Sequence, residues 1–191
     1  MKNKAAYISS ILIVLIIVGV AYARHELMIV PTQQLAFGFN TSMPMPNGGD
    51  LRQHIIGQEP YKKWSVWPGK GKMVKGTEPH GAIITVYVND IALGSIEAGK
   101  GMSNNSIVLK ENYTPAKKLA AVTVMYKVKG YNPDGGDWFW VKYKPDFEIE
   151  AEGKVGMCLG CHTGAKSNDY LYTGKVKAKG TSPGYGAPGH K

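Results

Sequence analysis

Three residues near the C-terminus, Cys158, Cys161 and His162, have side chains and a spacing that predict chemistry. They stand in the order Cys-Leu-Gly-Cys-His, and the chain has no other cysteine. Two thiols three residues apart can both form thioether bonds with the vinyl groups of one porphyrin, which is the pattern of c-type haem attachment. The imidazole that comes next can then reach the iron as its proximal ligand. The motif therefore predicts one covalently attached haem c.

Three other uses of the motif explain it less well. A structural zinc site needs four ligands, and this motif supplies three with no second cysteine pair elsewhere. A thioredoxin-like redox pair usually opens a helix after an early strand, whereas Cys158 lies close to the C-terminus. A disulfide suits an exported protein but gives His162 no role. We therefore favour haem.

The N-terminus has the features of a membrane-targeting segment. Residues 1–4 are basic, and residues 5–23 carry no charge. Residues 21–23, Ala-Tyr-Ala, resemble a signal-peptidase site that would leave Arg24 as the mature start. The apolar run is also nearly long enough to span a bilayer, so an uncleaved anchor in the inner membrane fits as well. Both alternatives place the remaining chain in the periplasm or elsewhere outside the cytoplasm.

The chain is basic, and its predicted export restricts the partners that this positive charge could attract. The formal net charge of +9 falls to +7 when Lys2 and Lys4 are removed with residues 1–23. Basic proteins often bind nucleic acid, but an exported protein does not meet it, so we expect no such partner. The surplus favours an acidic redox partner protein or anionic lipid headgroups, and solubility alone also accounts for it.

The exported part has the length of one domain. We expect residues 24–50 to be an N-terminal segment and linker, residues 51–174 to form the haem-binding domain, and residues 175–191 to be a flexible basic tail. Sequence periodicity predicts a helix from Leu51 toward Trp64 with Asp50 as its cap, and another through Ala98 with Asn89 and Asp90 as caps. The basic stretch between Lys62 and Lys75 has the composition of a solvated loop.

The remaining pattern predicts antiparallel strands and then a helix. Alternating or β-branched runs occupy residues 82–88, 106–111, 119–128 and 138–143, with a fifth around 147–149. Alternation puts Lys110 on the face of Ser106 and Val108, opposite Ile107 and Leu109. The predicted fold class is therefore α+β, a predominantly antiparallel sheet with a few helices and a C-terminal haem-binding helix.

The sixth position of the iron has no evident protein ligand. Electron-carrier cytochromes of class I use a methionine downstream of the haem motif, and no methionine stands after Met157. The histidines outside the motif are His25, His54, His80 and His190, and a single histidine is more often a surface or structural residue than a ligand. We favour an open or water-bound distal site, with capping by His80 or an upstream methionine as the alternative.

Several segments resemble one known family in their order and spacing. They are Tyr61-x-x-Trp64, the run Lys75-Gly76-Thr77-Glu78-Pro79-His80-Gly81 before Thr85-Val86-Tyr87-Val88-Asn89, then Val108-Leu109-Lys110-Glu111, Gly136-Asp137-Trp138 and the haem motif. Together they resemble the cytochrome P-460 family, which includes the cytochromes c′-β. The resemblance implies an antiparallel β fold, a homodimer and one haem c with an open distal face. It also implies a small nitrogen compound, hydroxylamine or nitric oxide, as ligand or substrate.

The resemblance assigns two further residues. The name-giving members link a lysine in the corresponding strand to the porphyrin edge, and Lys110 occupies that place; a strand lysine facing solvent is the alternative. The acidic proton relay of the hydroxylamine-oxidising members lies before the haem motif, where Glu148, Glu150 and Glu152 stand, and Glu152 is our predicted catalytic residue. If the chain is an enzyme, it is a hydroxylamine-oxidising haem oxidoreductase. The alternative is an electron-transfer cytochrome with a six-coordinate haem.

Overall fold

A computed structural model describes residues 42–77 and 79–176. The predicted signal or anchor segment, and residues 177–191 of the predicted tail, lie outside the described residues. Val176, at the start of that tail, is fully buried, and its carbonyl accepts a hydrogen bond from Gly101 N at 2.7 Å. Within residues 42–77 and 79–176, no helix is long and apolar enough to cross a membrane.

The first helical segment differs from the predicted continuous helix. It begins as α2 (Gly48–Gln53), continues as a π-helical turn, η2 (His54–Gln58), and is followed by a 3-10 turn, η3 (Tyr61–Lys63). Its cap is Asn47, whose side chain accepts a hydrogen bond from Asp50 N at 2.8 Å, so the expectation of Asp50 as cap was wrong. Pro60 separates η2 from η3, because proline lacks the N–H that a helix interior requires.

The strands form one antiparallel sheet, which confirms the predicted α+β class. Their order in the sheet is β1-β3-β4-β5-β6-β7, and β2 also pairs with β3. The bounds are β1 Ser65–Val66, β2 Val74–Lys75, β3 Ile83–Val88, β4 Ile107–Tyr113, β5 Leu119–Lys127, β6 Trp138–Tyr143 and β7 Ile149–Gly153. The fifth predicted strand lies a few residues later than expected, because Lys144 to Glu148 form the turn that precedes it.

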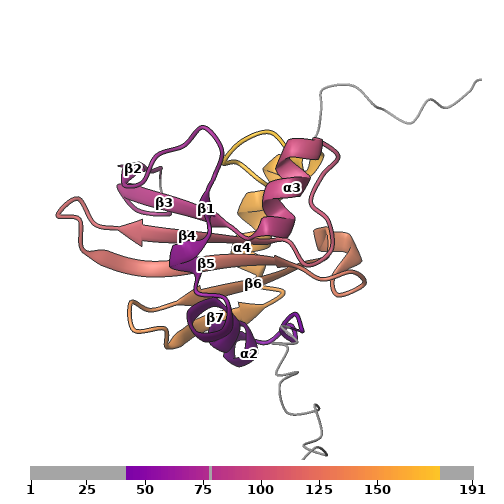
Figure 1. Cartoon of the computed structure of the whole chain (residues 1–191), viewed down its shortest axis with the longest axis horizontal. Helices are drawn as coiled ribbons and strands as arrows, with labels where there is room; N and C mark the ends of the chain where they lie inside the picture. The colour runs from indigo at the N-terminus through magenta and orange to yellow at the C-terminus, as the bar shows by residue number, and fades with distance from the viewer. Residues whose placement is uncertain (1–41, 78, 177–191) are drawn as a thin grey trace, which may run out of the picture. The chain divides into compact units, whose positions relative to one another are not determined.

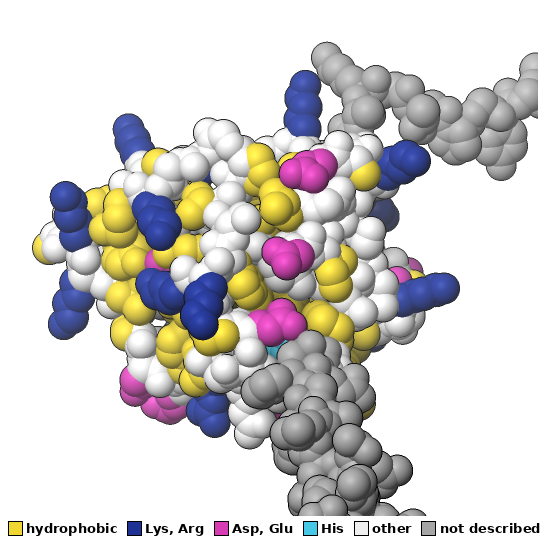
Figure 2. Space-filling view, viewed as in Figure 1, with side chains coloured by type: hydrophobic (Ala, Val, Ile, Leu, Met, Phe, Trp, Pro, Cys, Tyr) yellow, Lys and Arg dark blue, Asp and Glu magenta, His cyan; other side chains and the backbone are white. Residues whose placement is uncertain are grey.

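The basic stretch is not simply a loop. It contains β1 and β2, and Lys62 at its start forms an ion pair with Glu111, a glutamate that is almost fully buried. Glu111 also accepts hydrogen bonds from Tyr61 at 2.8 Å and Tyr113 at 2.7 Å. Burial raises the pKa of Glu111, but these hydrogen bonds outweigh it and hold the pKa below its usual value. Figure 2 shows basic side chains over the part of the visible surface where β2 and β3 lie.

The sheet has a separate core on each face. Leu51 of α2 packs with Leu109 and Val124 on one face. On the other face, Trp140 packs with Ala92 of α3 (Asp90–Ala98) and with residues around α4 (Gly156–His162) (Figure 1). This division results from the strand repeat, in which neighbouring side chains point to opposite faces. It places the helix with the cysteine motif against one defined face of the sheet.

The helix α3 has the predicted capping. Asn89 is its N-cap, and its side-chain oxygen accepts hydrogen bonds from Ala92 N and Ile107 N, each at 3.0 Å. The amide of Asn89 donates to Asn105 O at 3.0 Å. One buried side chain thus joins the end of β3, the start of α3 and the start of β4. Between β5 and β6 the chain forms a 3-10 turn, η4 (Pro133–Gly135).

Candidate haem site

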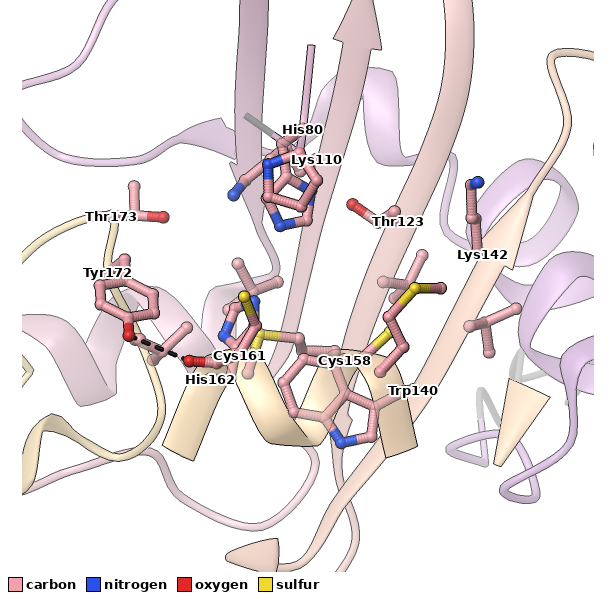
Figure 3. Close-up of a pocket in the computed structure, with 17 residues that line it drawn as sticks. His80, Lys110, Thr123, Trp140, Lys142, Cys158, Cys161, His162, Tyr172 and Thr173 are labelled. Atoms are coloured by element: carbon pink, nitrogen blue, oxygen red, sulfur yellow. Dashed lines mark hydrogen bonds between the residues drawn. The ribbon is translucent and has the colours of Figure 1, made fainter. Parts of the chain in front are cut away.

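A cavity of about 240 Å³ lies between α4 and the sheet face that α4 covers. Figure 3 shows Cys158, Cys161 and His162 on one side of it and His80 with Lys110 on the other. The loop after α4 adds Leu171, Tyr172 and Thr173 to its walls. The three residues of the cysteine motif therefore face one shared space.

The sheet wall of the cavity consists of two rows of side chains, each running across β4, β5 and β6. Aligned register places Lys110, Thr123 and Lys142 in one row. The same register places Val108, Met125 and Trp140 in the second row, two residues away along each strand. All six line the cavity. The rows are two residues apart, which is about 7 Å along the strands. A flat ring system could stand with its edge toward the sheet between them, with the polar row of Lys110 on one face and the apolar row of Trp140 on the other.

The cysteine motif is carried on α4, whose short helix brings both thiols to one side. Residues three apart lie on the same face of a helix, and Cys158 and Cys161 both line the cavity. Both are free thiols; Cys158 is half-buried and Cys161 is exposed. Burial raises the pKa of the Cys158 thiol, so it stays protonated at neutral pH.

The ring of His162 is held in one orientation. Its Nδ1 lies 2.6 Å from the carbonyl oxygen of Tyr170, so the N–H of that nitrogen donates and Nε2 is left to face a metal. Trp140 packs edge-on against the ring, with ring centroids 4.7 Å apart. Burial lowers the pKa of His162, although the Tyr170 carbonyl acts against that shift. A neutral imidazole with a fixed tautomer is the form that binds iron.

The Tyr170 carbonyl is positioned by Asp169. Both residues have left-handed backbone conformations, with φ of 57° for Asp169 and 65° for Tyr170. The Asp169 carboxylate accepts hydrogen bonds from Lys127 Nζ at 2.6 Å and Met102 N at 2.7 Å, and its carbonyl accepts one from Trp138 Nε1 at 3.0 Å. Because Lys127 and Asp169 are largely buried, this ion pair fixes the chain just beyond η5 (Thr163–Asn168).

His80 lies across the cavity from His162, with ring centroids 5.9 Å apart and ring planes at 82°. The turn that presents it ends at Gly81, which has φ of 90°; a Cβ there would lie 2.9 Å from Tyr113 O. Only glycine fits that backbone comfortably. Burial, and then the Lys110 charge, lower the pKa of His80 to about 4, so it is neutral at pH 7.

Lys110 points to the cavity, on the same face as Val108 and opposite Leu109, as its alternation predicted. Burial lowers its pKa to about 8. A larger fraction of the amine is therefore unprotonated near neutral pH than for an exposed lysine, and an unprotonated amine is a nucleophile. In the described part of the chain, Lys110 has no ion-pair partner.

The three candidate glutamates do not line this cavity. Glu148 pairs with Lys144 at 2.8 Å and Glu150 with Lys142 at 2.6 Å, both in exposed ion pairs. Glu152 accepts a hydrogen bond from Gly48 N of α2, which packs on the opposite face of the sheet. The structure thus brings Lys110 together with the cysteine motif but does not bring Glu152 there.

The residues of the cavity suit a haem. Two thiols, an imidazole with one free nitrogen and an apolar row are what a covalently held porphyrin needs. Lys110 and Lys142 line the cavity, whereas no described Asp or Glu does, so its lining is compatible with an anionic group even though Lys142 already pairs with Glu150. Sequence reasoning named His80 only as an alternative ligand, and it missed Trp140 and Asp169, for which the sequence offers no local signal.

Asp169→Asn tests the support of His162. The substitution keeps a residue that tolerates the left-handed conformation but leaves Lys127 buried without its partner, at a cost of about 3–5 kcal/mol in the free energy of unfolding. A weaker hydrogen bond to His162 makes the imidazole a poorer donor, so the reduction potential should rise. Denaturant unfolding and a redox titration measure the two effects.

The matched control is Glu148→Gln, which breaks the exposed Lys144–Glu148 pair and should leave the free energy of unfolding almost unchanged. Equal losses of stability in the two variants, with an unchanged reduction potential, would contradict this role of Asp169.

Comparison with known proteins gives the family. The sequence profile of the family Cytochrome P460 matches residues 58–173, which is more than half of the chain. No curated protein matches the chain. The matched segment runs from the end of η2 to the loop after α4, so it contains the whole sheet and the cavity. The chain therefore belongs to the cytochrome P460 family, and it is a haem-binding cytochrome.

Proposed function

We propose that the chain is an exported cytochrome with one haem c, attached through Cys158 and Cys161, that binds or transforms small nitrogen compounds at its iron. The observation that carries the proposal is the shared cavity, on which both thiols and the imidazole of His162 converge opposite His80 and Lys110. The haem supplies an iron that exchanges electrons and coordinates small ligands.

The protein's own groups have separate roles in this proposal. Cys158 and Cys161 hold the porphyrin by thioether bonds, so the cofactor is not lost when the protein unfolds. His162 coordinates the iron, with its orientation fixed by the Tyr170 carbonyl and by Trp140. Lys142, which also pairs with Glu150, would offset part of the charge of the propionates. The apolar row limits the entry of water on the His162 side.

The groups on the distal side of the cavity, opposite His162, decide whether the protein only binds a ligand or also transforms it. Oxidation of hydroxylamine removes electrons and protons together, so it requires an electron acceptor and a base. His80 lines the cavity and Glu152 does not, so placement favours His80 over Glu152 as the base, although a pKa of about 4 makes its imidazole a weak one. The electron acceptor would be a redox partner protein, which the net charge of +7 on the exported part favours as acidic.

Lys110 would tune the iron by a bond to the porphyrin edge. Its direction into the cavity and its pKa of about 8 both support this. Such a bond interrupts the conjugation of the ring and moves its Soret absorption strongly to the red.

A second function, electron transfer by a six-coordinate haem, is favoured by one observation. His80 stands opposite His162 at a distance that suits two ligands of one iron. The proposal includes a periplasmic location and inner-membrane anchoring by residues 1–23, both of which rest on the N-terminal sequence. It also includes a homodimer, which rests on the family.

Nitric oxide distinguishes the two functions. We expect the reduced protein, purified after export in its haem-bearing form, to bind nitric oxide with a stoichiometry of one per haem, because the cavity leads to the iron. Optical titration and EPR spectroscopy of the nitrosyl form measure it. Spectra that stay low-spin and unchanged when nitric oxide is added would reject ligand binding in favour of electron transfer.

Lys110→Met tests the cross-link, with Lys142→Met as control because Lys142 lines the same cavity in the same row. In the wild type and in Lys142→Met we expect a red-shifted Soret band and a peptide that joins Lys110 to the haem; Lys110→Met should lose both. Absorption spectra and peptide mass spectrometry are the measurements. An ordinary Soret band in all three proteins would remove the support for hydroxylamine oxidation and leave nitric oxide binding.

A further inference from the structure

We propose that the imidazole of His80 is the sixth ligand of the resting haem iron, and that a small ligand binds only when His80 moves aside. This rests on the proposed function in one respect, that His162 is the proximal ligand of a haem in the cavity. It changes the expected open distal face into a face closed by a residue of the chain itself.

The separation of the two rings carries the inference. A bond between a metal ion and an imidazole nitrogen is about 2 Å long, and that nitrogen lies about 1 Å from the ring centroid, so two imidazoles on one metal have centroids roughly 6 Å apart. The observed separation between His80 and His162 is 5.9 Å. A bound diatomic ligand between the iron and His80 would need a longer separation. The spacing therefore fits direct coordination rather than a hydrogen bond to a bound ligand.

The two histidines also lie on opposite sides of the space defined by the sheet. His162 packs on Trp140, in the apolar row, whereas His80 lies beside Lys110, in the polar row (Figure 3). A ring held edge-on between the rows has one imidazole on each face. The perpendicular planes of the two imidazoles, at 82°, are compatible with two axial ligands.

Other side chains of the cavity are poorer candidates for this position. Met125 belongs to the apolar row, the row of Trp140 on which His162 packs. Met157 is adjacent to Cys158 on α4 and is 78% exposed. His54 is fully buried and is not among the residues of the cavity. Lys110 is the remaining donor, and its ligation would keep a His80 variant low-spin.

The backbone around His80 provides a small hinge-like turn. His80 N donates to Thr77 O at 3.1 Å, and Gly76 N donates to Ala82 O at 2.8 Å. Gly81 then returns the chain to β3, and Pro79 and His80 of this turn line the cavity. Withdrawal of His80 would not require β3 to move, because the residue pairs between β3 and β4 begin at Ile83, after the turn.

Competition between His80 and an external ligand for the iron should lower the affinity for that ligand by a predictable factor. If His80 occupies the iron in nine molecules of ten or more, the apparent affinity for an external ligand falls by about tenfold or more relative to a protein without it. The rate of binding should also level off at high ligand concentration, because His80 must first dissociate. Removal of His80 should therefore strengthen and accelerate binding.

The test compares the full-length, exported, haem-bearing wild type with His80→Ala and His80→Gln, by optical and EPR spectroscopy of the oxidised state and by the rate of cyanide binding. Met125→Leu is the matched control, because it removes a buried thioether of the cavity at nearly constant volume. We expect low-spin spectra in the wild type and in Met125→Leu, and high-spin spectra in both His80 variants. Added imidazole should restore the low-spin spectrum of His80→Ala, and cyanide should bind to it at least about tenfold more rapidly than to the wild type.

A high-spin wild type, or a His80 variant that stays low-spin without added imidazole, would overturn the inference and leave the haem attachment intact. Failure of the haem proposal itself has a different result, a wild type without covalent haem. Glutamine fills much of the space of histidine but has no imidazole nitrogen that can bind iron. A spectral change common to both variants therefore reports the loss of an iron–imidazole bond, not a collapse of the cavity.

Discussion

The aligned register of β4, β5 and β6 is the constraint on which the site depends. It sets Lys110 beside Thr123 and Lys142, and Val108 beside Met125 and Trp140. A shift of one residue in any of the three strands would exchange the cavity side chains of that strand for those of the opposite core, because the side-chain repeat is two. The buried Glu111, the neighbour of Lys110 on the opposite face, makes such a shift costly, since its hydrogen bonds to Tyr61 and Tyr113 would be lost.

The second requirement is a fixed C-terminal segment. A helix as short as α4 has little stability of its own, so its position depends on the contacts made by the segment after it. Asp169 connects that segment to Lys127 on β5 and to the backbone of Met102, and the adjacent Tyr170 carbonyl then orients His162. The ion pair and His162, the proposed haem ligand, are thus parts of one structure, in which the sheet supports His162 and the turn before β3 supplies His80 on the opposite side of the cavity.

Much of this arrangement could be predicted from local sequence patterns, and the exceptions have physical causes. Alternation along residues 106–111 placed Lys110 on the correct face, and Asn89 indicated the start of α3, because both signals depend on nearest neighbours. The helix after residue 50 was predicted as continuous, but Pro60 interrupts it. Glu152 was assigned by its closeness in sequence to the haem motif, yet β7 pairs Glu152 with Val141 and its side chain meets α2. His80 and His162 meet only through the folding of the whole sheet, which no local pattern encodes.

The central claim is that one haem is bound covalently at α4. The most direct measurement is mass spectrometry of the tryptic peptide 155–166 from the exported protein, which contains Cys158, Cys161 and His162. The account predicts that this peptide carries the mass of one haem after denaturation, joined to both cysteines, and that Cys161→Ala retains at most a single, weaker attachment. An unmodified peptide, or one with Cys158 and Cys161 joined to each other, would contradict it.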